Sequence, residues 1–206
     1  MFPPNKTELD LNTNIELNNS QIPGLTYIPD YISLDEQNLL LSIIDQQEWS
    51  TKSKRRVQHY GYRYDYKSGL LASSSYLGTL PNWLQNIANR LFGDRLTAKL
   101  PDQVIINEYE PGQGITNHID CVPCFGKTII SLSLASPYLM DFTHSHTSEQ
   151  LPILLLPGSL IVMKEAARYE WQHGIAARKK DNYQDREITR TRRVSITFRE
   201  VLFPYK

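Results

Sequence analysis

The chain has 206 residues, 40% of them hydrophobic, which is enough for the core of one domain and too little for two of ordinary size. Its 22 basic and 22 acidic residues balance, so net charge gives no argument for a nucleic-acid or membrane partner. No stretch approaches the roughly 18 consecutive apolar residues of a membrane span, and the first residues do not resemble a signal peptide. We therefore expect a soluble cytoplasmic protein, or a nuclear one if the source is eukaryotic.

The N-terminal residues differ from the rest of the chain in pattern. Residues 1–20 are rich in Asn, Thr, Leu and acidic residues without a regular period, which predicts a poorly ordered tail. We place a single domain at residues 21–206, and a first short strand at residues 25–28.

Two amphipathic helices are predicted next. Ser33 and Glu36 have the spacing of a capping box, which marks the start of the first helix. The second helix is predicted to begin after Thr79, with Pro81 in its first turn, and to end at Gly93.

From Gln103 onward the pattern changes to short β-prone runs separated by turns. These runs cover residues 104–109, 128–134, 138–142, 153–156, 159–163 and 194–201. Two helices followed by many short strands predict an α+β protein whose strands form a sandwich or jelly roll. Pro111-Gly112 and Pro157-Gly158 mark turns, and the second joins two apolar runs as a hairpin would.

A metal site is suggested by His118, Asp120 and His173. Residues two apart in a strand face the same side, so His118 and Asp120 would point into one cavity while Ile119 packs against the opposite layer. Two histidines and one carboxylate are the ligand set that holds iron(II) and leaves positions open for chemistry. A single His-x-Asp pair is weak evidence, and His173 alone would be read as a structural histidine.

The last predicted strand alternates polar and apolar residues. Arg193, Ser195, Thr197 and Arg199 share one face, and Val194, Ile196 and Phe198 share the other. The polar face could stand in solvent on an edge strand. It could equally supply forked, permanently charged donors for a dicarboxylate near a metal. The strand by itself leaves both interpretations open.

Three ordered motifs together resemble a known family. They read Asn-x-Tyr-x-Pro-Gly-x-x-Ile-x-x-His-x-Asp from residue 107, Trp-x-His-Gly-Ile from residue 171, and Arg-x-Ser-x-Thr-Phe-Arg from residue 193. This set resembles the AlkB-like 2-oxoglutarate- and iron(II)-dependent dioxygenases over residues 22–202. The sequences within and around these motifs are most similar to those of AlkB homologues that hydroxylate a modified wobble uridine in transfer RNA. The resemblance implies a double-stranded β-helix, or jelly roll, with two N-terminal helices packed on one sheet and a basic, tyrosine-rich substrate lid.

The resemblance also implies roles for individual residues, with iron(II), 2-oxoglutarate and dioxygen as cofactor and cosubstrates. His118, Asp120 and His173 would bind the iron. The cosubstrate would be held by Arg193 at its distal carboxylate, by Arg199 at its keto-acid end, and by hydrogen bonds from Asn107 and Tyr109. Ser195 stands where many relatives have Asn, and we include it among the cosubstrate residues.

The stretch from Lys52 to Tyr66 would form the lid. Its basic groups could bind phosphates while its rings stack on an unpaired base, although such a stretch could also be a solvated hairpin. The residues predicted to contact substrate are Arg55, Arg56, His59, Tyr60, Tyr62 and, near the third metal ligand, Arg168. A second basic run from Arg178 to Arg193 could add phosphate contacts.

The nature of the substrate is less well defined. Repair enzymes of the family tend to carry a carboxylate two residues after the metal-binding Asp, where this chain has Val122, which favours a uridine-type base. We expect a nucleic-acid partner, RNA rather than DNA, a monomer, no membrane partner, and a tRNA methyltransferase on a separate chain. The alternatives are oxidative repair of alkylated DNA or RNA, a non-catalytic nucleic-acid-binding module, and protein hydroxylation. Cys121 and Cys124 are predicted to be ordinary loop thiols.

Overall fold

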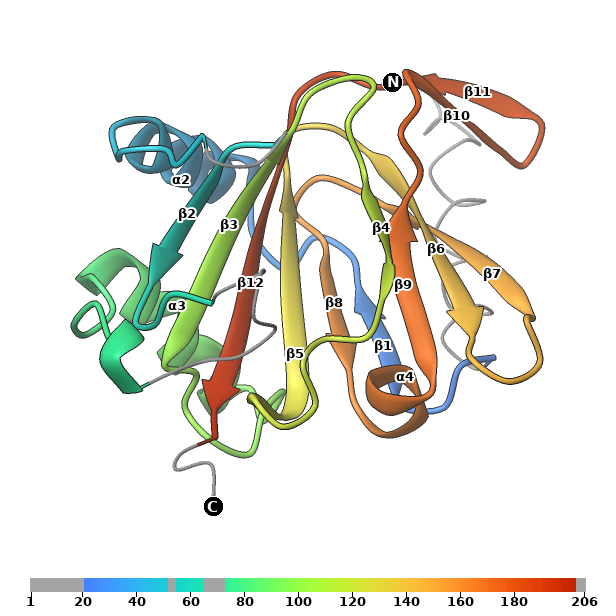
Figure 1. Cartoon of the computed structure of the whole chain (residues 1–206). Coiled ribbons are helices and arrows are strands. Elements are labelled where there is room, and N and C mark those ends of the chain that lie inside the picture. The colour runs from blue at the N-terminus through green and yellow to red at the C-terminus, as the bar shows by residue number, and fades with distance from the viewer. Residues whose placement is uncertain (1–20, 52–54, 65–72, 203–206) are drawn as a thin grey trace, which may run out of the picture.

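The computed structural model describes residues 21–51, 55–64 and 73–202, so the predicted tail and parts of the predicted lid lie outside the described residues. The described strands form two antiparallel sheets and a separate hairpin (Figure 1). The larger sheet has the strand order β1 (Leu25–Ile28), β8 (Leu160–Met163), β5 (Phe125–Leu134), β12 (Arg193–Val201), β3 (Gln103–Tyr109) and β2 (Val57–Tyr60). The smaller sheet has the order β4 (Ile115–His118), β9 (Trp171–Ile175), β6 (Tyr138–His144) and β7 (Gln150–Leu155).

The two predicted helices are confirmed as α2 (Leu34–Asp45) and α3 (Asn82–Gly93). The Ser33 hydroxyl accepts from the backbone N–H of Glu36 at 3.2 Å, and the Ser33 N–H donates to the Glu36 carboxylate at 3.1 Å, which is the expected capping box. A turn of 3₁₀ helix, η1 (Ser73–Ser75), and the short α4 (Glu165–Tyr169) complete the helices. None of the helices in the described ranges is both long and apolar enough to cross a membrane.

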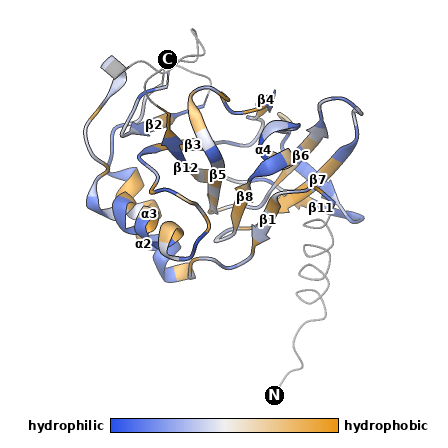
Figure 2. Cartoon of the chain, turned by 90° about the horizontal axis from the view of Figure 1, so that it is seen from below, coloured by the Kyte–Doolittle hydropathy of each residue, from blue (hydrophilic) through white to orange (hydrophobic). Residues whose placement is uncertain are grey.

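The larger sheet separates two hydrophobic cores. On one face, α2 and α3 pack through residues such as Ile44, Leu84 and Leu91 (Figure 2). On the other face, a second core lies between the two sheets and includes Phe125, Tyr138 and Phe142. This architecture confirms the predicted α+β fold class. The space between the two sheets can enclose a site.

Strand β12 lies in the middle of the larger sheet, between β5 and β3, and not at an edge. Val194, Ile196 and Phe198 are completely buried in the core beneath the helices. The polar residues of the other face are also buried, so the interpretation that this face stands in solvent is excluded. Their exposed fractions are 1% for Arg193, 4% for Ser195, 9% for Thr197 and 8% for Arg199. A buried polar face in a central strand requires partners, and the candidate site supplies them.

The Pro157-Gly158 turn does not form the predicted hairpin. It joins β7 of the smaller sheet to β8 of the larger one, so the chain crosses from one layer to the other. Gly158 has φ +81°, and a Cβ there would lie 2.9 Å from the carbonyl oxygen of Ile32, so only glycine fits this crossing without strain. The Pro-Gly pair correctly predicted a turn. Whether the strand after the turn pairs with the strand before it or enters the other sheet depends on the rest of the fold.

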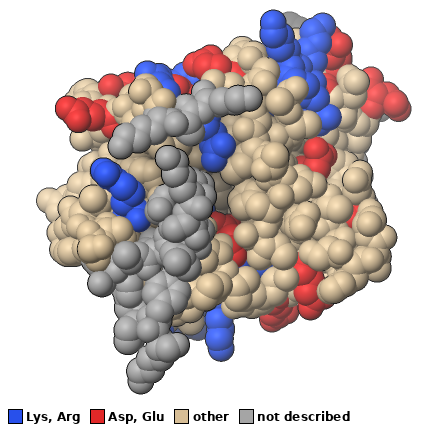
Figure 3. All heavy atoms as spheres, in the orientation of Figure 1, with Lys and Arg blue, Asp and Glu red and all other residues tan. Residues whose placement is uncertain are grey.

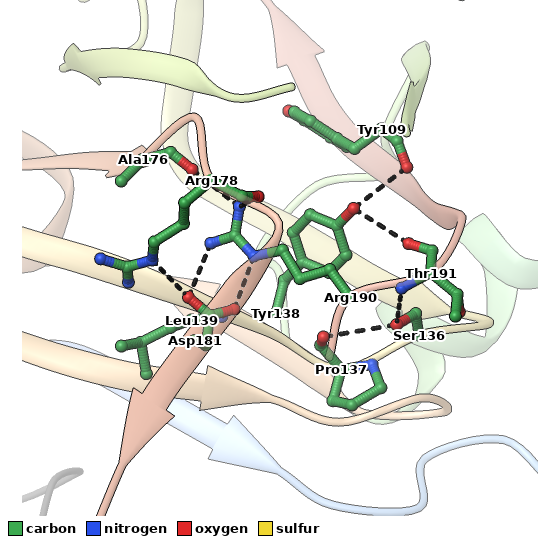
Figure 4. A network of polar contacts seen from close by, with 10 residues as sticks. All are labelled: Tyr109, Ser136, Pro137, Tyr138, Leu139, Ala176, Arg178, Asp181, Arg190 and Thr191. Atoms are coloured by element: carbon green, nitrogen blue, oxygen red, sulfur yellow. Dashed lines mark hydrogen bonds and ion pairs between the residues drawn. The ribbon is translucent and has the colours of Figure 1, made fainter. Parts of the chain in front are cut away.

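The hairpin of β10 (Lys180–Tyr183) and β11 (Arg186–Thr189) is fastened to the sandwich by buried charges (Figure 4). The carboxylate of Asp181 accepts from Arg190 Nε at 2.6 Å and Nη2 at 2.8 Å, and from Arg178 Nε at 2.6 Å. The Arg190 guanidinium lies 4.3 Å from the ring centre of Tyr138, whose hydroxyl donates to the carbonyl of Thr191 at 2.9 Å. This network fixes the chain immediately before β12.

Candidate metal centre and cosubstrate pocket

The fold brings His118, Asp120 and His173 together between the sheets. His118 ends β4 and is paired in register with His173 of β9, and the two ring centres lie 4.5 Å apart. One ligand atom from each of the three residues lies within 4.8 Å of the others. Strand β4 ends at His118, so Asp120 projects from the following loop and not from a continuing strand as predicted. Ile119, expected to pack on the opposite layer, lines the outer cavity described below.

His118 is held in an orientation that suits metal binding. Its Nδ1 lies 2.9 Å from the carbonyl oxygen of Thr116. Because a carbonyl can only accept, Nδ1 carries the proton and Nε2 keeps its lone pair for a metal.

Asp120 and His173 have pKa values that suit the same purpose. Burial raises the pKa of the Asp120 carboxyl, but Arg199 and the two histidines outweigh that effect and lower it to about 2. Burial is the main cause that lowers the pKa of His173 to about 3. At neutral pH the three residues therefore offer a carboxylate and at least one neutral imidazole, and metals bind ligands in these deprotonated forms. These residues fit iron(II).

Arg199 links the metal centre to β12. Its Nη2 lies 2.6 Å from Asp120 Oδ1, and its guanidinium lies 4.6 Å from the ring centre of Phe125. The ion pair leaves Oδ2 of Asp120, 3.6 Å from Nε2 of His173, on the side of the metal ligands. Arg199 was predicted to support the keto-acid end of the cosubstrate, and it lines the pocket for that molecule.

Arg193 lines the same pocket and is almost completely buried. Its guanidinium is 5.4 Å from the ring centre of Tyr109 and 5.9 Å from that of Tyr138. Nη2 donates to the Ser133 hydroxyl at 2.9 Å, whereas Nε and Nη1 have no hydrogen-bond partner among the described residues. A buried cation without a counter-ion costs several kcal/mol, so this position calls for a carboxylate. The residues fit the distal carboxylate of 2-oxoglutarate.

Other side chains of β3, β5 and β12 complete this pocket. Asn107, Tyr109 and Ser195 line it as predicted from the sequence, although their contacts with the cosubstrate stay a prediction. Two polar residues that line the pocket, Ser131 and Thr197, were not among the predicted site residues, nor was Ser133, which accepts from Arg193. The signal for the two serines was the alternating Ser-Leu-Ser-Leu run of β5, which pairs in register with the alternating β12 that carries Thr197.

A larger outer cavity of about 350 Å³ opens from the metal ligands toward the lid segment. Its volume is within the range of small-molecule sites. Besides His118, Asp120 and Arg199, its wall includes Arg55, Tyr64, Thr116 and Phe125. The Tyr64 and Phe125 ring centres lie 5.7 Å apart.

Of the predicted substrate residues, Arg55 is the one that lines this cavity, and the others lie elsewhere. Arg56 pairs with the buried Glu108 at 2.5 Å and lies over Trp49. The ring of Tyr60 packs edge-on against Trp83 of α3, toward the helical core, and Tyr62 packs against Tyr76. Burial lowers the pKa of His59 to about 4, so this residue is a neutral, largely buried histidine.

Arg168 does not point into the cavity, and its predicted substrate contact is corrected to a structural one. Its exposed fraction is 2%, and burial lowers its pKa. Its guanidinium donates to the carbonyl of Asp120 at 2.8 Å and, less closely, to those of Cys121, Phe125 and Gly126. Arg168 therefore holds the loop that carries a metal ligand.

The same loop contains a disulfide. The Sγ atoms of Cys121 and Cys124 are bonded, and their Cα atoms lie 5.2 Å apart, so the prediction of ordinary loop thiols is wrong. Spacing alone could not distinguish a bonded pair from two thiols, because the bond depends on the tight turn after Asp120.

Basic side chains on the surface gather over the β10–β11 hairpin (Figure 3). This is the second basic run of the sequence, and part of it is neutralised, since Lys180 pairs with Glu187 at 2.7 Å and Arg178 with Asp181. Phosphate binding by this hairpin stays a prediction.

Comparison with known proteins agrees with this geometry. The family described as the 2OG-Fe(II) oxygenase superfamily matches residues 24–199. An Arabidopsis thaliana protein named "Alkylated DNA repair protein ALKBH8 homolog" is 34% identical over 96% of this chain and 64% of its own length. A Macaca fascicularis protein named "tRNA (carboxymethyluridine(34)-5-O)-methyltransferase ALKBH8" is 37% identical over 80% of this chain and 26% of its own. The chain thus spans under two thirds of either relative.

The fold also matches solved structures. The structure of OsALKBH1 superposes with a TM-score of 0.68 and 15% identity, over 86% of this chain and 97% of the other. This likeness supports the jelly-roll architecture. By sequence the chain belongs to the 2OG-Fe(II) oxygenase superfamily and is homologous to its AlkB-type members, and it is a dioxygenase that uses iron(II), 2-oxoglutarate and dioxygen.

Proposed function

We propose that this dioxygenase oxidises a modified base in nucleic acid, by hydroxylating the side chain of a modified wobble uridine in transfer RNA. The observation that carries the proposal is the outer cavity, which is lined by the metal ligands His118 and Asp120 and walled by two aromatic rings and two arginines. Rings and cations suit an unpaired base, because rings stack on its face and cations bind its oxygens or phosphates. The similarity to the macaque protein, whose name includes carboxymethyluridine, supports uridine as the base.

The residues divide the work between two ends of the cosubstrate. Arg193 would pair with the distal carboxylate, and Asn107 and Tyr109 would orient the molecule. His118, Asp120 and His173 would hold the iron, while Arg199 keeps Asp120 in its ionised and oriented state. When bound, the iron supplies the activation of dioxygen that couples decarboxylation of 2-oxoglutarate to oxidation of a C–H bond. The buried walls of the pocket exclude bulk water from that reaction.

Succinate formation from 2-oxoglutarate is the direct test. We expect transfer RNA that lacks the hydroxylated uridine to stimulate succinate release several-fold, and mass analysis of its nucleosides to show the uridine gaining one oxygen atom. An Asp120→Ala protein should be inert, whereas Asp35→Ala, which removes an exposed carboxylate on α2, should behave as wild type. No stimulation by any transfer RNA would contradict the proposal.

Oxidative repair of alkylated bases is the second candidate, because the name of the Arabidopsis relative refers to repair of alkylated DNA. Incubation with a methylated oligonucleotide distinguishes the two, since demethylation releases formaldehyde and uridine hydroxylation does not. The residue two positions after Asp120 is Val122, which is 47% exposed, so it supplies no carboxylate to bind the amine of a methylated adenine or cytosine. We therefore expect little formaldehyde.

A further inference from the structure

Arg55 occupies a defined position between the cosubstrate pocket and the outer cavity. Its Nε donates to the side-chain oxygen of Asn107 at 3.1 Å, and its guanidinium lies 5.7 Å from the ring centre of Tyr109. It is half-buried, in contrast to Arg63 at the other end of the described lid segment, which is exposed. These two contacts to β3 orient the guanidinium, and it forms part of the wall of the outer cavity.

The charges in this wall are unequal. Among the described residues that line the outer cavity, the cationic side chains are Arg55 and Arg199, and the acidic one is Asp120. The Asp120 carboxylate is already engaged by Arg199 at 2.6 Å and belongs to the metal ligands. Among the described residues, the wall therefore offers hydrogen-bond donors and has no second carboxylate that could accept from a substrate amine.

A base in this cavity would be read by its oxygen atoms. The pairing edge of uracil carries two carbonyl oxygens, whereas cytosine and adenine carry an exocyclic amine that needs an acceptor. A guanidinium binds a carboxylate through two parallel hydrogen bonds and can also donate to a single carbonyl oxygen, and hydrogen bonds from a charged donor are about twice as strong as neutral ones. An amine placed beside the same guanidinium would lose its water and gain no partner, which is unfavourable.

We propose that Arg55 is a specificity-determining residue that binds an oxygen acceptor of the modified base, a carbonyl or a carboxylate on its C5 substituent. Arg55 thereby selects an oxygen-rich base over one that carries an amine. The inference rests on the proposed function, since it assigns the reading of the base in that same site. The adjacent Arg56 cannot take this role, because Glu108 holds it on the other side of β3.

Binding measurements test the proposal without turnover. The full chain, loaded with Mn(II) and 2-oxoglutarate, would be titrated at fixed salt into three anticodon stem-loop RNAs that differ only at the wobble nucleotide. That nucleotide would be uridine with a carboxymethyl group at C5, unmodified uridine, or cytidine. We expect wild type to bind the carboxymethyl RNA at least about tenfold tighter than the cytidine RNA, as one charge-assisted contact allows. Arg55→Met should reduce that ratio to about one or two.

Two further variants separate base reading from general attraction to RNA. Arg63→Met removes an exposed cation of the same segment, so it should weaken all three complexes equally and leave the ratio unchanged. Arg55→Lys keeps the charge but loses the fork, so its ratio should lie between those of wild type and Arg55→Met. Thermal unfolding of each variant shows whether the fold is intact.

The possible outcomes distinguish a failure of the role of Arg55 from a failure of the proposed function. An unchanged ratio in a folded Arg55→Met protein would overturn the role of Arg55, as would a wild-type preference for cytidine or no measurable binding of any of the RNAs. If wild type shows the ratio but no RNA stimulates succinate release, the proposed oxidation fails while the reading of the base stands.

Discussion

Arg190 and Arg193 are three positions apart, and both guanidinium groups lie near the ring of Tyr138. Both side chains are buried, but they differ in whether the protein supplies a counter-ion. Arg190 is 2% exposed and carries its own counter-ion, Asp181, in a forked ion pair. Arg193 is 1% exposed, and two of its nitrogens have no partner among the described residues. The comparison teaches that a structural arginine is neutralised by the fold, whereas a ligand-binding arginine is left for the ligand to neutralise. His59 shows a third solution, because its burial removes the charge altogether.

The largest effect is expected from breaking the neutralised pair. Arg190→Met leaves Asp181 buried without its main partner, so the free energy of unfolding should fall by about 3–5 kcal/mol. Chemical denaturation measures the change. The double variant Arg190→Met, Asp181→Leu should recover much of it, because the buried carboxylate is gone and Arg178, which also loses its partner, is partly exposed to solvent. Equal destabilisation of the single and double variants would contradict this explanation.

Lowering the pH should reveal the contribution of His59, whose burial disfavours its charged form. The folded pKa of His59 is about 4, below its unfolded value of about 6.5, so between these values only the unfolded chain binds the proton. Stability is therefore full above the unfolded pKa and lost as pH falls toward the folded one, by up to about 3 kcal/mol. Unfolding measured from pH 7 to 4 on the metal-free protein should show a smaller loss in His59→Asn than in wild type.

Removing the arginine that awaits a ligand should affect binding and spare stability. Arg193→Met should weaken 2-oxoglutarate binding to the Mn(II) protein about 100-fold, because the distal carboxylate loses its forked, desolvated partner. Without cosubstrate the variant should be as stable as wild type or more so, since an unpaired buried charge has been removed. Calorimetric titration and thermal unfolding check both halves. A destabilised variant that keeps its affinity would reverse the distinction between Arg190 and Arg193.

The smallest effect is expected from removing the disulfide of the metal-ligand loop, because the buried Arg168 also holds this loop by donating to its backbone carbonyls. Cys121→Ser, Cys124→Ser removes the disulfide that closes the same loop, and a closed loop this short is worth about 2 kcal/mol or less. If Arg168 itself holds the loop, the unfolding free energy should fall by no more than that amount and metal affinity should change by less than about threefold. Alkylation followed by mass analysis, with and without reductant, shows whether the bond is present.

Helices and faces were predictable from the sequence because they depend on local periodicity. The capping box at Ser33 and the alternation along β12 each required only neighbouring residues. The partners of those faces were not predictable in the same way. In the sequence Arg55, Arg56 and Arg168 are equally good candidates for substrate binding. Only the fold shows that Arg56 pairs with Glu108, that Arg168 donates to loop carbonyls, and that Arg55 lines a cavity. The ligand triad was found because three ordered motifs carried it, not because its spacing was distinctive.

The lone cation of Arg193 has a consequence beyond catalysis. A molecule that binds only the folded state stabilises it in proportion to the logarithm of its concentration, by about 2.7 kcal/mol at one hundred times its dissociation constant. Without 2-oxoglutarate the buried guanidinium of Arg193 has no counter-ion in the described part of the chain, so this form has the lower free energy of unfolding. It is therefore unfolded more often and degraded by proteases more readily. We therefore expect the cellular lifetime of this chain to follow the supply of a central metabolite, so that scarcity would reduce its amount as well as its rate.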